Sequence, residues 1–254
     1  MNLTYFDSNS WLIEIDGSRI LLDPWLVGKL TFGNLAWLFE GKKNNPQPIP
    51  ENIDLILLSQ GLEDHAHPPT LRELDRNIRV VASPNAAKVA QQIGYKTIET
   101  LEHGATFKTK TGQVEIKAVP GSPIGPTLVE NGYIIKGLES GKNIYYEPHG
   151  YHSKSLQQEA PIDVIITPLI NLKLPLLGAV IKGQETALEV CRWLTPQVIL
   201  STAAGGDVDF KGAIASILQA DGTVEQFNQL LQQHQLTTKA INPQPGTPIE
   251  LALV

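Results

Sequence analysis

The chain has 254 residues, of which 42% are hydrophobic and 18% are charged, so it has ample material for a large core. This composition excludes an intrinsically disordered chain, because disorder requires low hydrophobicity together with high net charge. The formal net charge is −6 and no run of basic residues occurs, so nucleic acid is not an expected partner.

The sequence also indicates where the protein works. Cys191 is the single cysteine, so no intrachain disulfide can form, which favours a reducing compartment. The first residues lack the basic region and apolar run of a secretory signal. No segment approaches the roughly 18 uninterrupted apolar residues of a membrane span. We therefore expect a soluble, cytoplasmic protein with no membrane span.

The first 50 residues predict strands followed by a long loop. Segments 2–6, 11–15 and 19–22 are short, rich in β-branched and aromatic residues, and separated by turn residues, which is typical of strands. Residues 26–50 are apolar and interrupted by Gly and Pro, which predicts a long loop with room for one short helix. Loops of this length in compact domains are often lids or binding loops.

From residue 54 onward the sequence predicts a mixture of strands and helices in one α+β domain, residues 1–254. The predicted strands are 54–59, 80–82, 96–100, 105–109, 114–119, 127–136, 143–146, 163–167, 198–201 and 249–253. The predicted helices are 70–76, 84–93, 184–194 and 224–234. Between them, the apolar segment 169–182 contains Pro175 and Gly178 and predicts a second binding loop.

One polar loop carries the most specific signal. It follows the buried strand 54–59 and has the sequence SQGLEDHAHP, residues 59–68. The segment resembles the metal-binding loop of the metallo-β-lactamase superfamily, especially its sugar-lactone and phospholipid hydrolase branch, in which the pattern is H-x-H-x-D-H. Closely spaced His and Asp residues let one short loop reach two metal ions, and imidazole and carboxylate groups both suit zinc.

The resemblance continues along most of the chain, in the right order and at credible spacings. Residues 20–25 (ILLDPW) are similar to an early strand of the superfamily that ends in Asp-Pro. Residues 144–150 (IYYEPHG) are similar to the strand that normally ends in Gly-Asp-Thr, whose Asp bridges both metals. Residues 163–168 and 197–202 resemble the last part of the domain. The resemblance implies a four-layer αββα sandwich.

The sequence departs from the superfamily pattern at most ligand positions. The resemblance implies that the lost histidines fall on Gln60, Leu62, Gly121 or Ser122, and Thr202 or Ala203. Leucine and glycine offer no ligand atom, and amides and hydroxyls bind zinc weakly. One of the two usual metal sites is therefore expected to be lost.

The second site keeps more of its ligands. Asp64 and His65 match the motif, and His149 aligns with the bridging Asp, so the resemblance implies at most one divalent metal, most suitably zinc, held by these three groups. His67 and Glu147 stand close in sequence and are candidates for moving a proton. The alternative is a site without metal, in which Asp64 caps the following helix and His65 holds the loop by hydrogen bonds.

Two functions from different classes follow. The first is a metal-dependent hydrolase acting on an ester, lactone or phosphodiester of an apolar small molecule. The second is a catalytically inactive binding protein for a hydrophobic ligand or a protein partner. In both, loops 26–39 and 169–181 are expected to meet above the Asp64–His65–His149 group.

The two loops supply the predicted substrate-binding side chains. These are Trp25, Trp37, Phe39 and Leu174, with Leu176 and Leu177 nearby. The alternative for both loops is that they simply pack into the core.

Overall fold

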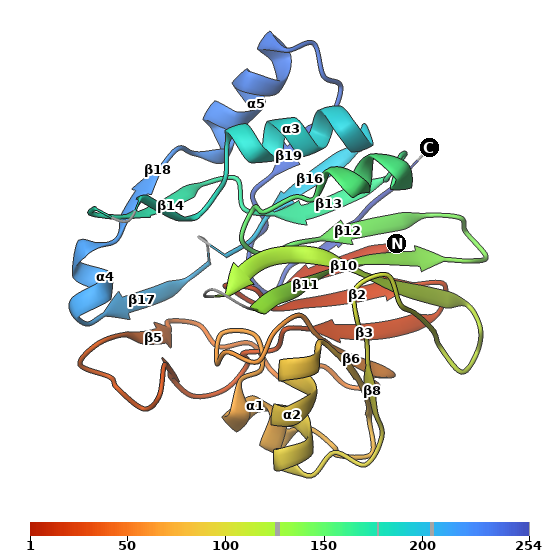
Figure 1. Cartoon of the computed structure of the whole chain (residues 1–254), viewed down its shortest axis with the longest axis vertical. Helices are drawn as coiled ribbons and strands as arrows, with labels where there is room; N and C mark the ends of the chain where they lie inside the picture. The colour runs from red at the N-terminus through yellow and green to blue at the C-terminus, as the bar shows by residue number, and fades with distance from the viewer. Residues whose placement is uncertain (125–127, 177, 204–205, 254) are drawn as a thin grey trace.

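Two seven-stranded sheets pack face to face, and helices cover the outer face of each sheet (Figure 1). This arrangement is seen in a computed structural model that describes residues 1–124, 128–176, 178–203 and 206–253. It confirms the four-layer αββα sandwich that the sequence predicts.

The first sheet brings four parallel strands together. In spatial order it contains β20 (Pro248–Glu250), β1 (Asn2–Tyr5), β2 (Trp11–Ile15), β3 (Ser18–Leu22), β6 (Leu55–Leu58), β7 (Arg79–Ala82) and β8 (Ile98–Thr100). Strands β3, β6, β7 and β8 are parallel, so their carboxyl ends lie at one edge. Asp23 and Ser59 follow β3 and β6 at this edge, where open parallel sheets usually bind ligands.

The second sheet also contains four neighbouring parallel strands. Its order is β19 (Lys239–Ile241), β16 (Val198–Ser201), β13 (Val164–Thr167), β12 (Asn143–Tyr146), β11 (Leu128–Gly137), β10 (Val114–Ile124) and β9 (Thr106–Lys108). Strands β12, β13, β16 and β19 are parallel. Glu147 and Thr202 directly follow the carboxyl ends of β12 and β16.

Three clusters of buried apolar side chains hold the layers together. The central cluster joins the inner faces of the sheets and includes Trp11, Tyr133 and Ile166. A second packs α1 (Pro68–Glu73) and α2 (Pro84–Ile93) on the first sheet. A third packs the 3-10 helix η1 (Lys154–Glu159), α3 (Glu185–Leu194) and α5 (Val224–Gln233) on the second.

Most predicted elements agree with the structure to within a few residues. Helix α2 begins after Ser83 and ends at Gly94, whose φ of 98° suits glycine. Helix α1 begins two residues earlier than predicted, because His67 caps it and Pro68 fits its first turn. Thr127, the first residue of one predicted strand, lies outside the described residues. No described helix is long and apolar enough to cross a membrane.

The two predicted loops contain strands, which is a correction to the sequence analysis. Strands β4 (Leu30–Thr31), β5 (Glu40–Lys43) and β17 (Val208–Lys211) form one small sheet, and β14 (Asn171–Leu174), β15 (Gly178–Ile181) and β18 (Gln219–Asp221) form another. With the short helix α4 (Ala213–Ile217) they make what we call the apolar lobe. It lies at the left of Figure 1.

A buried ion pair attaches the apolar lobe to the first sheet. The Lys43 ammonium lies 3.3 Å from the Asp7 carboxylate, and both side chains are buried. Lys43 also donates to the Phe6 carbonyl and lies over the Trp25 ring. Asp7 accepts a hydrogen bond from the Asp207 amide, which leads into β17. Two segments of the lobe therefore depend on one buried pair of charges.

We predict that Lys43→Met lowers the free energy of unfolding by about 3–5 kcal/mol, because it leaves the Asp7 charge buried without its cationic partner. Asp7→Asn in the same chain should recover part of this loss. Lys29→Met is the matched control, since Lys29 forms an exposed pair with Glu40, and it should cost less than about 1 kcal/mol. Chemical denaturation measures all three, and equal losses for Lys43→Met and Lys29→Met would contradict the anchoring role.

Candidate metal centre

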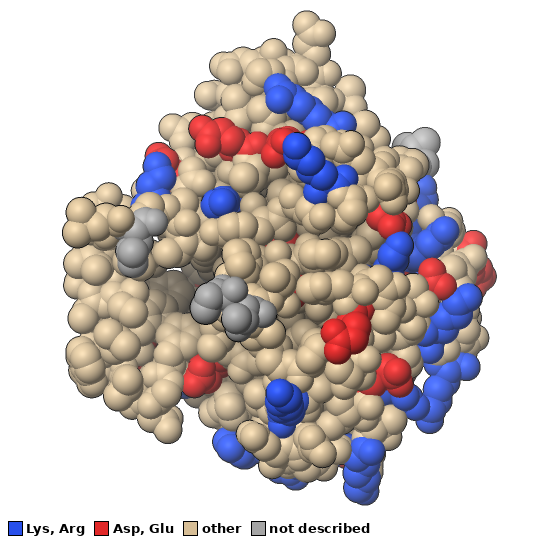
Figure 2. Space-filling model, in the orientation of Figure 1, with Lys and Arg blue, Asp and Glu red and all other residues tan. Residues whose placement is uncertain are grey.

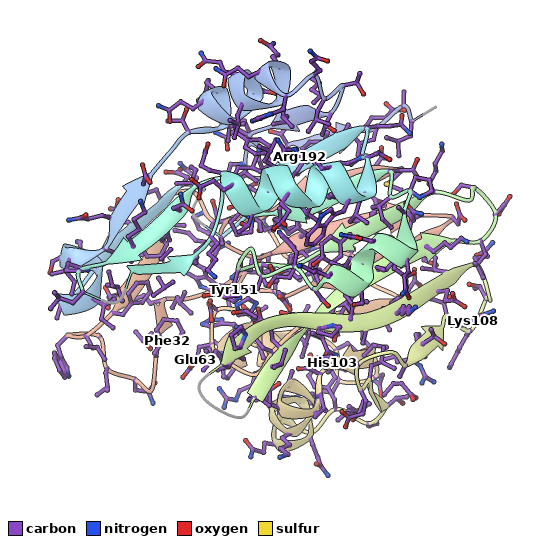
Figure 3. All side chains as sticks on the ribbon, turned by 45° about the horizontal axis from the view of Figure 1, so that its top comes forward. Phe32, Glu63, His103, Lys108, Tyr151 and Arg192 are labelled. Carbon is purple, nitrogen blue, oxygen red and sulfur yellow. The ribbon has the colours of Figure 1, made fainter. Side chains whose placement is uncertain are left out.

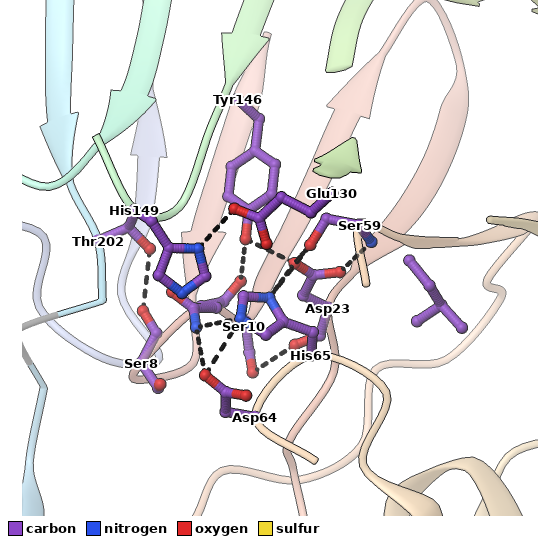
Figure 4. A network of polar contacts seen from close by, with 12 residues as sticks. Ser8, Ser10, Asp23, Ser59, Asp64, His65, Glu130, Tyr146, His149 and Thr202 are labelled. Atoms are coloured by element: carbon purple, nitrogen blue, oxygen red, sulfur yellow. Dashed lines mark hydrogen bonds and ion pairs between the residues drawn. The ribbon is translucent and has the colours of Figure 1, made fainter. Parts of the chain in front are cut away.

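The fully buried Asp23 carboxylate organises the centre. Its Oδ1 accepts from the Ser59 amide at 2.7 Å, and the Ser59 hydroxyl donates to Oδ2. The same Oδ2 lies 2.7 Å from His65 Nδ1 and accepts from the Tyr146 hydroxyl at 2.7 Å. Asp23 therefore joins the ends of β3 and β6 to β12 of the opposite sheet (Figure 4).

His65 is fixed on both sides of its ring. With Nδ1 held by Asp23, its Nε2 faces Asp64 Oδ2 at 3.1 Å and the Asn9 amide at 3.2 Å. Burial lowers the pKa of His65, but the carboxylates of Asp64 and Asp23 outweigh it and hold that pKa well above its usual value. The same contact with His65 overcomes burial at Asp64 and lowers the pKa of its carboxyl group.

His149 reaches the centre from the opposite sheet. Its ring centroid lies 5.1 Å from that of His65, and its Nδ1 lies 2.6 Å from Glu130 Oε1. The carboxylate orients the ring and leaves Nε2 for another partner, as acidic residues often do for metal-binding histidines. In Figure 4 the ring stands between Glu130 and the Asp64–His65 pair.

Asp64, His65 and His149 converge and offer ligand atoms that lie within 4.8 Å of one another. Three buried oxygens around them have no hydrogen-bond partner: Asp64 Oδ1, Asn9 Oδ1 and Gln60 Oε1. Unpaired buried oxygens are costly, and a cation would satisfy them. One carboxylate and two imidazoles with carboxylate partners therefore fit a single divalent metal.

Glu147 lies at the back of the centre. Its Oε2 accepts from the amides of His149 at 3.2 Å and Tyr151 at 2.8 Å, which shapes the loop that presents His149. Its side chain is fully buried, and burial together with the neighbouring Glu130 carboxylate raises its pKa well above the usual value. It is not among the described residues that line the cavity next to His149.

His67, predicted to move a proton, makes its described hydrogen bonds with Thr70 and Lys29. Its Nδ1 caps α1 by accepting from the Thr70 amide and lies 3.0 Å from the Thr70 hydroxyl. Its Nε2 lies 3.2 Å from the Lys29 carbonyl. Both ring nitrogens thus hold loop and helix together, and the proton-moving role of His67 stays a prediction. Burial lowers the pKa of His67 to about 4.

A cavity of about 540 Å³ opens above the metal-ligand cluster, and Asp64 and His149 form part of its floor with Asn9 and Gln60. Its walls come from the apolar lobe, as predicted for the two loops, and include Phe32, Phe39, Leu172, Leu174 and Phe210. Figure 2 shows a hollow between the lobe and the body of the protein, surrounded mainly by uncharged surface.

The polar loop also supports this wall directly. The Glu63 carboxylate accepts from the Gly33 amide at 2.9 Å, and Figure 3 places Glu63 close to Phe32. Phe32 packs on Phe39, and Phe39 packs on Phe210, with ring centroids 5.2 and 5.5 Å apart. The aromatic wall is therefore continuous from the residue after β4, through the residue before β5, to β17.

Two of the four predicted substrate-binding residues do not line the cavity. Trp25 is fully buried beneath Lys43 and donates to the Gly28 carbonyl, so it supports the lobe from below. Trp37 is 70% exposed and lies outside the lining. Phe39 and Leu174 do line it, whereas Leu176 is fully exposed at a turn and Leu177 lies outside the described residues.

The positions of the lost histidines now hold other contacts. Gln60 and Leu62 line the cavity, and Thr202 donates to the Ser8 carbonyl while accepting from Trp11 Nε1. The Ser122 amide donates to Glu130 Oε1. None of these residues supplies an imidazole ligand in place of the lost histidine.

Sequence reasoning missed Asn9, Asp23, Glu130 and Tyr146 as members of the centre. Asp23 has a signal, because the Asp-Pro pair after a strand is part of the resemblance. Asn9 and Glu130 lie in segments without a motif, and only strand pairing brings them to the site.

Comparisons with known proteins agree with this geometry. Among solved structures, the chain is similar to a possible metal-dependent hydrolase from Veillonella parvula (TM-score 0.72, 13% identity) and to an isothiocyanate hydrolase from Delia radicum gut bacteria (TM-score 0.69, 17% identity). Each match covers 99% of both chains. At these identities they show the fold alone, which the chain also shares with a protein from Bacillus subtilis described as a metallo-β-lactamase fold protein (TM-score 0.62, 12% identity, 98% of this chain and 99% of that chain).

The family follows from the sequence comparison. The model of the β-lactamase superfamily domain matches residues 2–203, and the chain therefore belongs to this family within the metallo-β-lactamase superfamily. It is also 26% identical over 184 residues to a UPF0173 metal-dependent hydrolase from Flavobacterium johnsoniae, covering 67% of this chain and 73% of that protein.

We predict that His67 makes stability depend on pH without taking part in the chemistry. Its pKa falls from 6.5 in the unfolded chain to about 4 in the fold, so neutral His67 contributes up to about 3 kcal/mol above pH 6.5. This contribution is lost as the pH falls from 6.5 towards 4. His67→Asn keeps a capping side chain but does not titrate, so its unfolding free energy should vary less over that range.

The control is Gln232→Asn, which changes an exposed side chain and alters no titratable group, so it should leave the pH profile as in the wild type. Denaturant titrations at several pH values measure both variants. An unchanged profile in His67→Asn would contradict the assignment.

Proposed function

We propose that this protein is a metal-dependent hydrolase whose substrate is an uncharged, largely apolar ester or lactone. The observation that carries the proposal is the convergence of Asp64, His65 and His149 at the floor of an apolar cavity. A ligand cluster that faces a cavity places a bound cation next to whatever fills that cavity. This is the arrangement that metal-assisted hydrolysis requires.

Some residues at this site are proposed to hold the ion, and others orient the residues that hold it. Asp64, His65 and His149 hold the ion, most suitably zinc, while Asp23 and Glu130 keep the two rings oriented. When bound, the cation would supply Lewis-acid polarisation of a carbonyl oxygen and activation of water. Asn9 lies against both Asp64 and His65, so its amide orients these two ligands.

The walls of the cavity narrow the substrate class. None of the described lining residues is Lys or Arg, and most are aliphatic or aromatic. Enzymes that bind phosphates rely on cationic side chains or clusters of backbone amides. We therefore favour a neutral ester or lactone over a phosphodiester. A volume of about 540 Å³ is within the range of small-molecule sites.

The relatives are consistent with this proposal. The Flavobacterium johnsoniae protein is described as a metal-dependent hydrolase, and one structural neighbour is described as an isothiocyanate hydrolase. Isothiocyanates are small neutral molecules, as the cavity here favours. We transfer only the general reaction class, hydrolysis assisted by a metal, because fold alone does not determine chemistry.

A binding protein without catalysis is the second candidate. It is favoured by the loss of the imidazole ligands at Gln60, Leu62 and Thr202, while the apolar cavity is retained. In that case the cavity would bind a hydrophobic ligand and the remaining polar cluster would stabilise the fold.

We predict that His149→Ala lowers the zinc bound per chain at least tenfold, because it removes one of the three protein ligands and leaves only Asp64 and His65. Elemental analysis of protein purified without a metal-affinity tag measures this directly. His234→Ala changes an exposed histidine outside the centre and should retain the wild-type zinc content. Wild-type protein that contains and binds no stoichiometric metal would favour the binding protein instead.

We also predict that Leu174→Asp raises KM for long-chain p-nitrophenyl esters at least tenfold and leaves the metal content unchanged, because it places a charge in the apolar wall. Leu176→Asp is a closely matched control, since Leu176 is fully exposed two residues away. Hydrolysis rates over a series of acyl chain lengths test both. Equal effects of the two substitutions, or a preference for charged esters, would contradict the proposed substrate class.

A further inference from the structure

A cavity of about 490 Å³ lies at the edge of the sandwich opposite to the metal-ligand cluster. It is lined by the first residues of β6 and β7, Leu55 and Arg79, whereas the polar loop of the metal centre follows the other end of β6. Phe107 of β9 lines it from the second sheet. Figure 3 places Lys108, the residue after Phe107, on the opposite side of the molecule from Glu63. No described residue lines both this cavity and the apolar one.

The Arg79 guanidinium lines this cavity without an acidic partner. Its Cζ lies 5.6 Å from the centre of the Phe107 ring, so the cation is held over the aromatic face. Its Nε is buried and has no hydrogen-bond partner, and within the described part of the chain its side chain forms no ion pair. A buried donor without an acceptor is costly, so an acceptor is expected to enter from the cavity.

The charges that line the cavity limit what this acceptor is. Arg79 and Lys110 are positive and Asp54 and Asp75 are negative, so these side chains balance one another. Each acid already accepts a backbone amide hydrogen bond, at 2.8 and 2.9 Å respectively. A single carboxylate therefore suits Arg79 better than a phosphate dianion, which the two acids would repel more strongly.

Apolar side chains supply another part of the wall. Ile53, Ile78 and Phe107 all line the cavity. A planar guanidinium binds a carboxylate through two parallel hydrogen bonds, and Nε can donate one of them. A ligand that satisfies both features has one carboxylate and a short apolar body.

We propose that this cavity binds a small monocarboxylate with an apolar body, whose carboxylate pairs with Arg79. The site goes beyond the proposed function, because it lies at the other edge of the sandwich and does not depend on a bound metal. Phe107 holds the guanidinium in place, and the apolar body packs against Ile53 and Ile78. The carboxylate supplies the acceptor that the buried Nε lacks.

A titration of the full wild-type chain with hexanoate tests the site through the proton–nitrogen NMR signal of Arg79 Nε. We expect this signal to shift saturably with a Kd below about 1 mM, because the Nε proton gains an acceptor. Hexanol, which has no charge, should leave the signal in place, and hexyl phosphate should bind more weakly than hexanoate. No shift with hexanoate, an equal shift with hexanol, or binding of hexyl phosphate as tight as that of hexanoate would overturn the proposal.

Arg79→Met tests the same contact by substitution. It should remove the Nε signal, which assigns that signal, and weaken hexanoate binding at least tenfold in calorimetry, because a hydrogen bond to a charged group is lost. Arg72→Met is the matched control, since Arg72 is exposed and lies outside the cavity lining, and it should bind as the wild type does. Thermal unfolding verifies that both variants are folded, and the wild-type titration decides the question if Arg79→Met is not. A folded Arg79→Met that binds hexanoate as tightly as the wild type would contradict the site.

Leu174→Asp separates the two cavities, because hexanoate is also apolar enough to enter the substrate cavity. This substitution places a charge in the apolar wall there and should leave the shift at Arg79 unchanged. A shift that disappears in Leu174→Asp would place the ligand in the substrate cavity, which overturns the new site and leaves the proposed function standing. A shift at Arg79 in protein that binds no metal would support the new site although the proposed function had failed.

Discussion

The arrangement of this protein depends on one buried carboxylate. Asp23 accepts from the amide and hydroxyl of Ser59 and from Tyr146, and it holds His65, so it connects both sheets at their ligand-binding edge. A charge removed from water must find enough donors, and here the donors come from two segments far apart in sequence, the polar loop 59–68 and β12. The requirement to satisfy Asp23 therefore fixes how the sheets meet and how His65 points.

The same principle governs the opposite half of the centre. Glu130 orients His149 as Asp23 orients His65, and Glu147 fixes the loop that carries His149 by accepting from the backbone amides of His149 and Tyr151. The apolar lobe then closes over these polar groups and is attached through the buried pair of Lys43 and Asp7. Polar groups with defined partners thus lie beneath a wall that offers only apolar contacts. The polar groups hold the ion, and the apolar wall selects the ligand.

Much of the fold could be predicted from sequence, because buried strands and the Ser83-Pro84 and Gly94 helix boundaries are local signals. The ligand cluster could be predicted from the motif at Asp64 and His65 and its counterpart at His149. Glu130 could not, since it reaches the site only through the pairing of β11 with its neighbours.

The sequence predicts loops in place of the apolar lobe for the same reason. Strand β5 pairs with β17, more than 150 residues later, and β14 pairs with β18, more than 40 residues later. No local pattern shows such partners. Trp25 and Trp37 could not be placed from the sequence for a related reason. Composition predicts that aromatic side chains pack against other residues, but it does not show which of them face the cavity.

The central claim is that a cation binds at the floor of the apolar cavity. Anomalous diffraction from crystals of the full chain soaked in zinc, recorded above and below the zinc absorption edge, tests it most directly. We expect the strongest difference peak within bonding distance of Asp64, His65 and His149, on the side that faces the cavity. Peaks confined to surface residues, with none at these three side chains, would contradict the claim.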